Sequence, residues 1–198
     1  MPAKPVSPAH LFKRLVMTVL FVVLPIILCK IMTYKACICD IGRESLVGKY
    51  VFVRADFNVP MVETIEGMKV ADNSRITATL PTLRFLSRIV VCSHLGRPRG
   101  KNVGALSLAP VASEFRTIPS TDNITLHFVN ECIGDLRLAS IQSLRNGEAL
   151  LLENVRFHKE EEANDDVFAQ LLAAGMDIYV NDAFGSAHRG NHGSQFFG

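Results

Sequence analysis

The feature of this sequence that most constrains its fold is an alternation, from about residue 40 onward, of short apolar runs with amphipathic stretches. The apolar runs are almost continuously hydrophobic, as strands buried on both faces are. We expect strands at residues 50–55, 89–93, 124–129, 149–152 and 178–181. We expect helices at residues 75–87, 107–116, 135–144 and 165–174. Asp165 and Asp166 stand at the head of the last helix, where a cap and the helix dipole both favour carboxylates. Strand–helix alternation at this spacing predicts one α/β domain built on a parallel sheet with right-handed crossovers.

Four of the expected strands are followed directly by residues that an ordinary turn does not need. They are Asp56, Phe57, Asn58 and Val59-Pro60 after the first strand, His94, Gly96, Arg97 and Pro98 after the second, Glu153, Asn154, Arg156 and His158 after the fourth, and Asp182, Phe184, Gly185, His188 and Arg189 after the fifth. Arg75 opens the first helix near the same edge. Ligands of open parallel sheets bind at the carboxyl ends of the strands. Because a guanidinium donates two hydrogen bonds to a phosphate or carboxylate, the pattern predicts a site for a small polyanion.

Each of these residues also has a plain structural explanation. A single arginine at a strand end is ordinarily a solvated surface charge, and Asp56 and Asn58 can be turn residues before a proline. His94 can cap a helix or be satisfied within a loop, and Gly96 can merely supply a positive φ angle. The acidic run at residues 160–162 is typical of a solvated helix face, and we assign it no chemistry. The recurrence of polar clusters on one predicted edge favours the binding site.

The first thirty residues follow a different pattern. Lys4, Lys13 and Arg14 precede an apolar run over residues 15–29, which Lys30 closes. As a helix this run would span about 22 Å, short of the ~30 Å hydrocarbon core of a bilayer. Three interpretations stay open: a targeting leader for a plastid or another organelle, a spurious extension before a true start at Met32, and a marginal membrane anchor. A start at Met32 would make the protein cytoplasmic, and membrane contact would require that the leader be retained. We therefore separate residues 1–31 from a domain over residues 32–198.

The composition narrows the class of protein. Hydrophobic residues make up 48% and charged residues 20% of the 198 positions, which suits a folded core. The net charge of +2 comes without a dense basic tract, so no nucleic-acid partner is expected. The 5 cysteines are odd in number and lack repeated paired spacings. We therefore expect no disulfide framework and no metal site, and interpret the cysteines as reduced thiols.

Four segments resemble those of the phosphoglycerate kinase family and occur in that family's order. They are Val53-Arg54-Ala55-Asp56-Phe57-Asn58-Val59-Pro60, Ser93-His94-Leu95-Gly96-Arg97-Pro98, Leu152-Glu153-Asn154-Val155-Arg156-Phe157-His158 and Asn181-Asp182-Ala183-Phe184-Gly185-Ser186-Ala187-His188-Arg189. Shorter matches at residues 72–76 and 132–134 extend the resemblance from about residue 33 to residue 190. Four long motifs in order are highly specific.

The resemblance implies a Rossmann-like open parallel sheet with helices on both faces, the N-terminal, substrate-binding half of that family's fold. It implies reversible phosphoryl transfer between Mg-ATP and the carboxylate of 3-phosphoglycerate, giving ADP and 1,3-bisphosphoglycerate, in glycolysis or the Calvin cycle. A monomer with these small molecules as its partners is expected.

The resemblance also implies a role for each site residue. Asp56 and Asn58 would hold the glycerate portion of the substrate, and Arg75 would be the catalytic residue that stabilises the phosphoryl group in transfer. The 3-phosphate would be held by four residues, His94, Arg97, Arg156 and Arg189. Further substrate contacts are implied for Phe57, Leu95 and Gly96. Arg54 would pair within the site rather than contact substrate. These roles fit phosphoryl transfer, which needs positioning and charge neutralisation more than covalent chemistry.

The sequence departs from the family in three places. Family members are about twice as long, and the resemblance places their nucleotide and magnesium sites in a C-terminal domain that we do not expect in this chain. The segment at residues 86–89 is shorter than the corresponding segment of the family. Residues 190–198 fit the family's continuation poorly, so we expect the domain to be truncated at its C-terminal end. We therefore expect the isolated chain to be inactive without the nucleotide domain. The alternative functions are a non-catalytic 3-phosphoglycerate-binding module and an inactive fragment.

Overall fold

The computed structural model describes residues 38–121 and 123–183, and it divides into two units, Met1–Ile41 and Gly42–Gly198. In the first unit the described residues form one short 3-10 helix, η2 (Ile38–Asp40). All elements below belong to the second unit. The expected leader at residues 15–29, and Arg189, lie outside the described residues. Within the described part of the chain, the helices are too short or too polar to cross a membrane.

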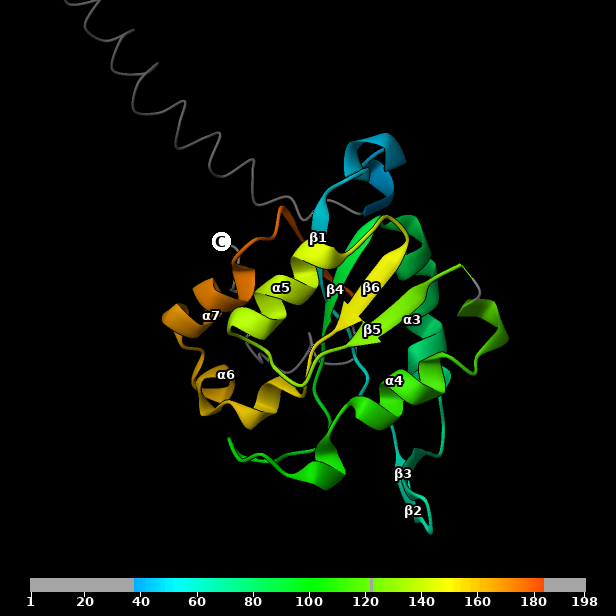
Figure 1. Cartoon of the computed structure of the whole chain (residues 1–198), viewed down its shortest axis with the longest axis vertical. Helices are drawn as coiled ribbons and strands as arrows, with labels where there is room; N and C mark the ends of the chain where they lie inside the picture. The colour runs from blue at the N-terminus through cyan, green and yellow to red at the C-terminus, as the bar shows by residue number, and fades with distance from the viewer. Residues whose placement is uncertain (1–37, 122, 184–198) are drawn as a thin grey trace, which may run out of the picture. The chain divides into compact units, whose positions relative to one another are not determined.

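A five-stranded parallel sheet forms the centre of the second unit (Figure 1). Its strands are β1 (Tyr50–Arg54), β4 (Arg88–Cys92), β5 (Thr125–Phe128), β6 (Glu148–Leu151) and β7 (Ile178–Asn181), in the spatial order β5-β6-β4-β1-β7. The inner strands are rich in valine, leucine and isoleucine that are almost fully buried, because helices cover both faces. These are the five strands that the sequence predicts, each with bounds within one residue of expectation.

The strand register brings the carboxyl ends of the strands to one edge. Arg54 at the end of β1 pairs with Cys92 at the end of β4 and with Asn181 at the end of β7. Leu151 at the end of β6 pairs with Phe128 at the end of β5. The loops that leave these strands therefore start side by side, although they are far apart in the sequence.

Helices pack on both faces of the sheet, as expected. They are α3 (Ser74–Phe85), α4 (Ala109–Phe115), α5 (Asp135–Ser143), α6 (Lys159–Ala163) and α7 (Asp166–Ala173). Ile141 of α5 and Phe168 of α7 join one core cluster with Phe52 and Val90 of the sheet. Side chains alternate along a strand, so the neighbouring Val91 and its equivalents point to the opposite face, where α3 and α4 lie (Figure 1).

The ends of α7 are fixed by two side chains. Asp165 is the N-cap and accepts a hydrogen bond from the Phe168 amide at 2.8 Å, the capping role that the sequence predicts. At the other end, Arg137 of α5 donates to the Leu172 carbonyl oxygen at 2.6 Å and to the Ala174 carbonyl oxygen at 3.4 Å. Arg137 is only 1% exposed, and burial lowers the pKa of its guanidinium. This buried arginine ties α5 to the last turn of α7, a role for which the sequence carries no signal.

Among the strands and α-helices, the hairpin of β2 (Met61–Thr64) and β3 (Gly67–Val70) and the helix α6 were not expected. The antiparallel hairpin follows β1, and its short strands contain no buried residue and no buried apolar run. Helix α6 contains the acidic run at residues 160–162. The interpretation of that run as a uniformly solvated face is wrong, because the side chain of Glu161 is only 11% exposed and pairs with two arginines, as described below.

Candidate functional site

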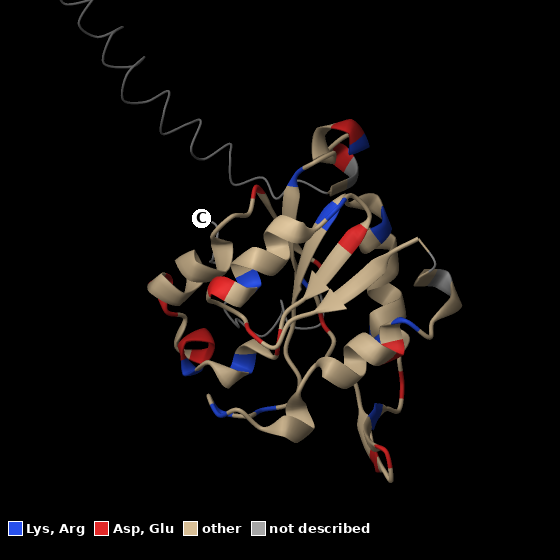
Figure 2. Cartoon of the chain, in the orientation of Figure 1, with Lys and Arg blue, Asp and Glu red and all other residues tan. Residues whose placement is uncertain are grey.

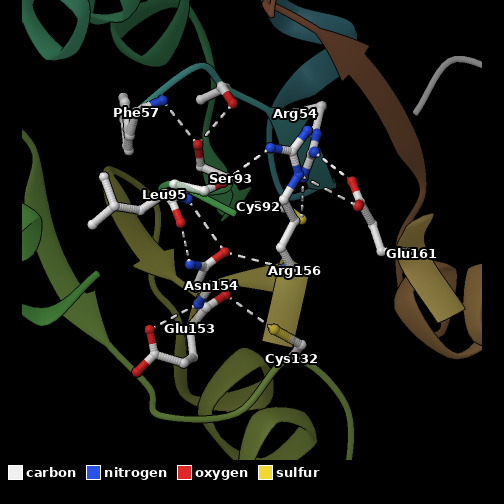
Figure 3. A network of polar contacts seen from close by, with 12 residues as sticks. Arg54, Phe57, Cys92, Ser93, Leu95, Cys132, Glu153, Asn154, Arg156 and Glu161 are labelled. Carbon is white, nitrogen blue, oxygen red and sulfur yellow. Dashed lines mark hydrogen bonds and ion pairs between the residues drawn. The ribbon is translucent and has the colours of Figure 1, made fainter. Parts of the chain in front are cut away.

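Ser93 joins the loop after β1 to the end of β4 (Figure 3). Its hydroxyl donates to the Ala55 carbonyl oxygen at 2.9 Å and accepts from the Phe57 amide at 2.8 Å. Ser93 is fully buried, so both groups are shielded from water. The loop carrying Asp56 and Asn58 is thereby fixed beside the loop that starts at His94.

Asp56 and Asn58 are held by contacts to two other elements. The carboxylate of Asp56 forms an ion pair with Nη1 of Arg75, in the first turn of α3. Oδ1 of Asn58 accepts a hydrogen bond from the Gly96 amide at 2.8 Å. The side chain of Arg75 is 49% exposed whereas that of Asp56 is 16% exposed, so the guanidinium reaches from solvent toward the edge of the sheet. These two residues do more than form a turn before a proline: they organise the site.

Asn154 forms the buried scaffold beneath the loop after β4. Its side-chain amide donates to the Leu95 carbonyl oxygen at 2.7 Å and to the Leu106 carbonyl oxygen at 2.9 Å, and its Oδ1 accepts from the Leu95 amide at 3.2 Å. Glu153 accepts from the Ser107 hydroxyl and from the Leu108 amide, both at 2.8 Å. These two residues, expected only as members of a polar cluster, fix loops rather than face a ligand.

Gly96 lies in close contact with Leu106 and with Arg156. Its φ angle is +62°, and a Cβ atom at this position would lie 2.8 Å from a side-chain carbon of Leu106. Its carbonyl oxygen accepts from Nη1 of Arg156 at 3.0 Å. Glycine adopts this conformation without strain, whereas a larger residue would also require the Leu106 side chain to shift.

Arg156 and Arg54 share one carboxylate, that of Glu161. Nη2 of Arg54 lies 2.8 Å from Oε1 of Glu161, and Nε of Arg156 lies 3.8 Å from Oε2. Arg54 also donates to Sγ of Cys92 at 3.3 Å. Burial raises the pKa of the Cys92 thiol, so this sulfur is uncharged near neutral pH and Glu161 is the charged partner of Arg54. The expectation that Arg54 pairs within the site agrees with this geometry.

His94 is buried and neutral. Burial, and then the positive charges of Arg54, Arg156 and Arg75, lower the pKa of its imidazole to about 3. Its Nδ1 atom is buried and has no hydrogen-bond partner among the described residues. His94 can therefore donate one hydrogen bond to an anion, but it adds no positive charge at physiological pH.

The remaining predicted residues differ in what they offer to a ligand. Arg97 is exposed, and its guanidinium makes no hydrogen bond or ion pair within the described part of the chain. Phe57 and Leu95 are 0% and 2% exposed, with side chains in the core. The Phe57 amide is bonded to Ser93, and both backbone polar groups of Leu95 are bonded to Asn154. Phe57 and Leu95 therefore shape the wall of the site. Arg189 falls outside the described residues.

Other features at this edge are structural. Cys92 and Cys132 are buried free thiols, and the Cys132 thiol donates to the Glu153 carbonyl oxygen at 3.0 Å. The ring of His158 packs on Phe168 at 4.9 Å between centroids, and burial lowers the pKa of that histidine. In residues 38–121 and 123–183 no group of three or more His, Cys, Asp or Glu could hold a metal ion.

Sequence reasoning missed Ser93 and Glu161 as site residues. Ser93 belongs to one of the segments that resemble the family, so the sequence places it next to the site. The sequence does not predict that its hydroxyl bridges two loops. Nothing in the run of three glutamates distinguishes the middle one. The role of Glu161 comes from its contacts with two arginines. Arg54 lies far from it in the sequence, and Arg156 lies nearby in the sequence but on another element.

The fold and the site together define an α/β protein with a cluster of arginines at the carboxyl edge of a parallel sheet. The sequence model of the phosphoglycerate kinase family matches residues 40–196, and the chain belongs to that family. It is 45% identical over 159 residues to a phosphoglycerate kinase of Rippkaea orientalis, covering 78% of this chain and 38% of that protein. It is 47% identical over 152 residues to one of Acidobacterium capsulatum, covering 73% of this chain and 37% of that protein.

Solved structures give the same assignment. The phosphoglycerate kinase of Coxiella burnetii aligns with a TM-score of 0.56 at 35% identity, covering 72% of this chain and 34% of that one. The phosphoglycerate kinase of Pyrococcus horikoshii aligns with a TM-score of 0.63 at 28% identity, covering 75% of this chain and 37% of that one. The chain thus spans little more than a third of the length of these relatives.

Proposed function

We propose that this chain is the 3-phosphoglycerate-binding part of a phosphoglycerate kinase. That enzyme transfers a phosphoryl group reversibly between ATP and the carboxylate of 3-phosphoglycerate, with ADP and 1,3-bisphosphoglycerate as the products. The observation that carries the proposal is the convergence of Arg75, Arg156 and His94 beside Asp56 and Asn58, at the edge where ligands of parallel sheets bind. Along the ribbon, Lys and Arg are interspersed with Asp and Glu over the described residues (Figure 2).

The phosphate of the substrate would be bound by Arg97 and Arg156, with Arg189 added from outside the described residues. Arg97 is exposed and unpaired within the described part of the chain, and a planar guanidinium can donate two hydrogen bonds to one phosphate. Neutral His94 would supply a further hydrogen bond. The glycerate hydroxyl would lie at Asp56 and Asn58, whose oxygens accept hydrogen bonds.

Arg75 would act on the reacting carboxylate. Its half-exposed guanidinium is anchored on Asp56 through one nitrogen, which leaves its other donors directed away from that carboxylate. Charge spreads over the oxygens of a phosphoryl group in transfer, and a fixed cation placed there lowers the barrier. Arg75 would therefore contribute mainly to the transition state.

Mg-ATP or Mg-ADP would be bound outside the described residues. These residues offer no cluster suited to a metal ion, so we assign no magnesium ligand among them. When bound, the magnesium nucleotide supplies the phosphoryl group and neutralises part of its charge. The part of the enzyme represented here would bind the acceptor, orient its carboxylate and exclude water from it.

Calorimetric titration of the chain tests the binding half of this proposal. We expect weak saturable binding of 3-phosphoglycerate and none of Mg-ATP. Arg97→Ala should weaken binding by roughly 1.5–3 kcal/mol, the usual value of a hydrogen bond to a charged group. Arg97→Lys should recover only part of this, because an ammonium lacks the planar fork. Arg145→Ala, at an exposed position before β6, is the control.

Two results would contradict the binding proposal. One is equal affinity in all four proteins, which would make Arg97 an ordinary surface charge. The other is saturable binding of Mg-ATP at micromolar concentration. A coupled assay separates binding from turnover: a chain that binds 3-phosphoglycerate and, joined to the nucleotide domain of a relative, forms no 1,3-bisphosphoglycerate is a binding module.

A further inference from the structure

Glu161 pairs with the two most deeply buried arginines of the site (Figure 3). It contacts Arg54, at the end of β1, at 2.8 Å and Arg156, in the 3-10 helix η6 (Val155–Phe157), at 3.8 Å. The side chains of Glu161 and Arg54 are 11% exposed, and that of Arg156 is 14% exposed. Its neighbour Glu162 is exposed on the same helix.

Two guanidiniums at this depth need a counter-charge. Like charges in a poorly hydrated site repel each other strongly, and the removal of water makes each charge costly. Among the described residues, Glu161 is the one carboxylate that pairs with either arginine. Without it, Arg54 and Arg156 would move apart or draw in an anion from solvent.

The contacts of Arg156 show what this arrangement achieves. Its Nη1 atom donates to the Gly96 carbonyl oxygen at 3.0 Å. Its Nε atom is buried without a hydrogen-bond partner among the described residues and forms a longer ion pair with the Glu161 carboxylate, at 3.8 Å. Nη2 makes no hydrogen bond within the described part of the chain. The guanidinium is therefore held by one hydrogen bond and one ion pair, and Nη2 is left for a ligand.

We propose that Glu161 is a positioning residue for the anion site: its ion pair with the Nε side of Arg156 keeps the guanidinium in the orientation that presents Nη2 to the bound phosphate. The inference rests on the proposed function, because the anion is the substrate phosphate. Glu161 itself does not touch the ligand. It acts by holding Arg156, and by keeping the charge of Arg54 paired away from the ligand.

The direction in which Glu161→Gln changes the affinity for the anion distinguishes a positioning role from a purely electrostatic one. Glu161→Gln removes a negative charge near an anion site, so a purely electrostatic role predicts tighter anion binding. A positioning role predicts weaker binding, because Arg156 loses its fixed orientation. We expect the affinity of the full chain for 3-phosphoglycerate to fall about tenfold, a typical coupling between residues in contact. Glu162→Gln, one residue along the helix and exposed, is the matched control and should bind like the parent.

A double-mutant cycle separates positioning from a general loss of stability. If Glu161 acts through Arg156, Glu161→Gln should have no further effect on affinity in an Arg156→Ala background. An equal loss in both backgrounds would overturn the proposal, as would tighter binding by Glu161→Gln alone.

A ligand-free measurement keeps the inference distinct from the proposed function. The Nε–H bond of Arg156 should have a high NMR order parameter in the parent, and a lower one in Glu161→Gln but not in Glu162→Gln. An unchanged order parameter in Glu161→Gln would overturn the inference. If the parent binds inorganic phosphate but not 3-phosphoglycerate, the proposed function fails. The affinities of the parent, Glu161→Gln and Glu162→Gln for inorganic phosphate then test the positioning role of Glu161. If the parent binds neither, both proposals fail.

Discussion

The side-chain amide of Asn154 is hydrogen-bonded to both backbone polar groups of Leu95, donating to its carbonyl oxygen at 2.7 Å and accepting from its amide at 3.2 Å. Residues 95 and 154 belong to different loops of the sheet edge. A single buried amide therefore determines how the loop carrying Gly96 and Arg97 sits above the end of β6. The stability and function of the site should depend on this contact in measurable ways.

Asn154→Ala should lower the free energy of unfolding by about 3–4 kcal/mol, because it leaves several buried backbone groups without partners. Urea denaturation measures the loss. Asn146→Ala is the control: Asn146 also accepts two hydrogen bonds, from Ser87 and Arg88, but is exposed. It should cost no more than about 1 kcal/mol. Similar losses in both variants would show that burial of the Asn154 network is unimportant.

Arg137→Met should destabilise the chain by about 2–3 kcal/mol, because the carbonyl oxygens at the end of α7 lose a buried charged donor. Thermal or urea denaturation checks it against Ser140→Ala, an exposed change in the same helix. Methionine keeps much of the side-chain volume, so the loss reports the hydrogen bonds rather than a cavity. A variant as stable as the parent would mean that water satisfies those carbonyls equally well.

His94 should make the chain sensitive to acid. Its pKa is about 3 in the folded chain and about 6.5 in an unfolded one. Between these pH values the unfolded state binds a proton that the folded state does not, so stability falls as the pH drops. The slope from this residue is at most about 1.4 kcal/mol per pH unit.

The measurement is a series of urea denaturations between pH 7.5 and about pH 4.5. His94→Gln removes the titrating group, so its stability should depend less steeply on pH than that of the parent. Identical slopes in the two proteins would mean that His94 takes up a proton in the folded state.

Arg75 and Arg156 should separate catalysis from binding. In residues 33–198 joined to the nucleotide domain of a complete relative, Arg75→Ala should lower kcat by about a hundredfold or more, since a lost transition-state donor costs ~2.7–4 kcal/mol. Its effect on KM should be modest. Arg156→Ala should mainly raise KM, because a phosphate contact is made equally in the ground and transition states.

The parent graft is the control for both changes. If it shows no turnover, the comparison is made on full-length relatives at the positions equivalent to Arg75 and Arg156. An unchanged kcat in Arg75→Ala would show that this arginine is not the catalytic residue.

The sheet and its binding edge could be predicted from the sequence because buried parallel strands are continuous apolar runs. Val51, Ile89 and Leu150 belong to such runs, and the polar residues after them mark where the strands end. The hairpin of β2 and β3 was not predictable in this way, because its strands contain no buried residue and no buried apolar run. Element bounds differed by a residue or two, because helix ends are set by caps such as Asp165 and by tertiary contacts.

The site could be predicted only in part. Asp56, Asn58 and Arg156 stand in family-like segments, so their importance was visible. The low pKa of His94, which leaves its imidazole uncharged, depends on its burial and then on three arginines from separate elements. Glu161 was not predicted because the local sequence does not distinguish it from the two neighbouring glutamates. Only the folded chain places Arg54 in contact with Glu161.

The Arg54–Glu161 pair joins residues 107 positions apart in the chain. A contact of this span forms late, since the long loop between its ends must be closed and the intervening strands paired. The anion site therefore does not exist in partly folded chains. A phosphate ligand that needs the complete site should slow unfolding of the native chain and leave the rate of folding almost unchanged.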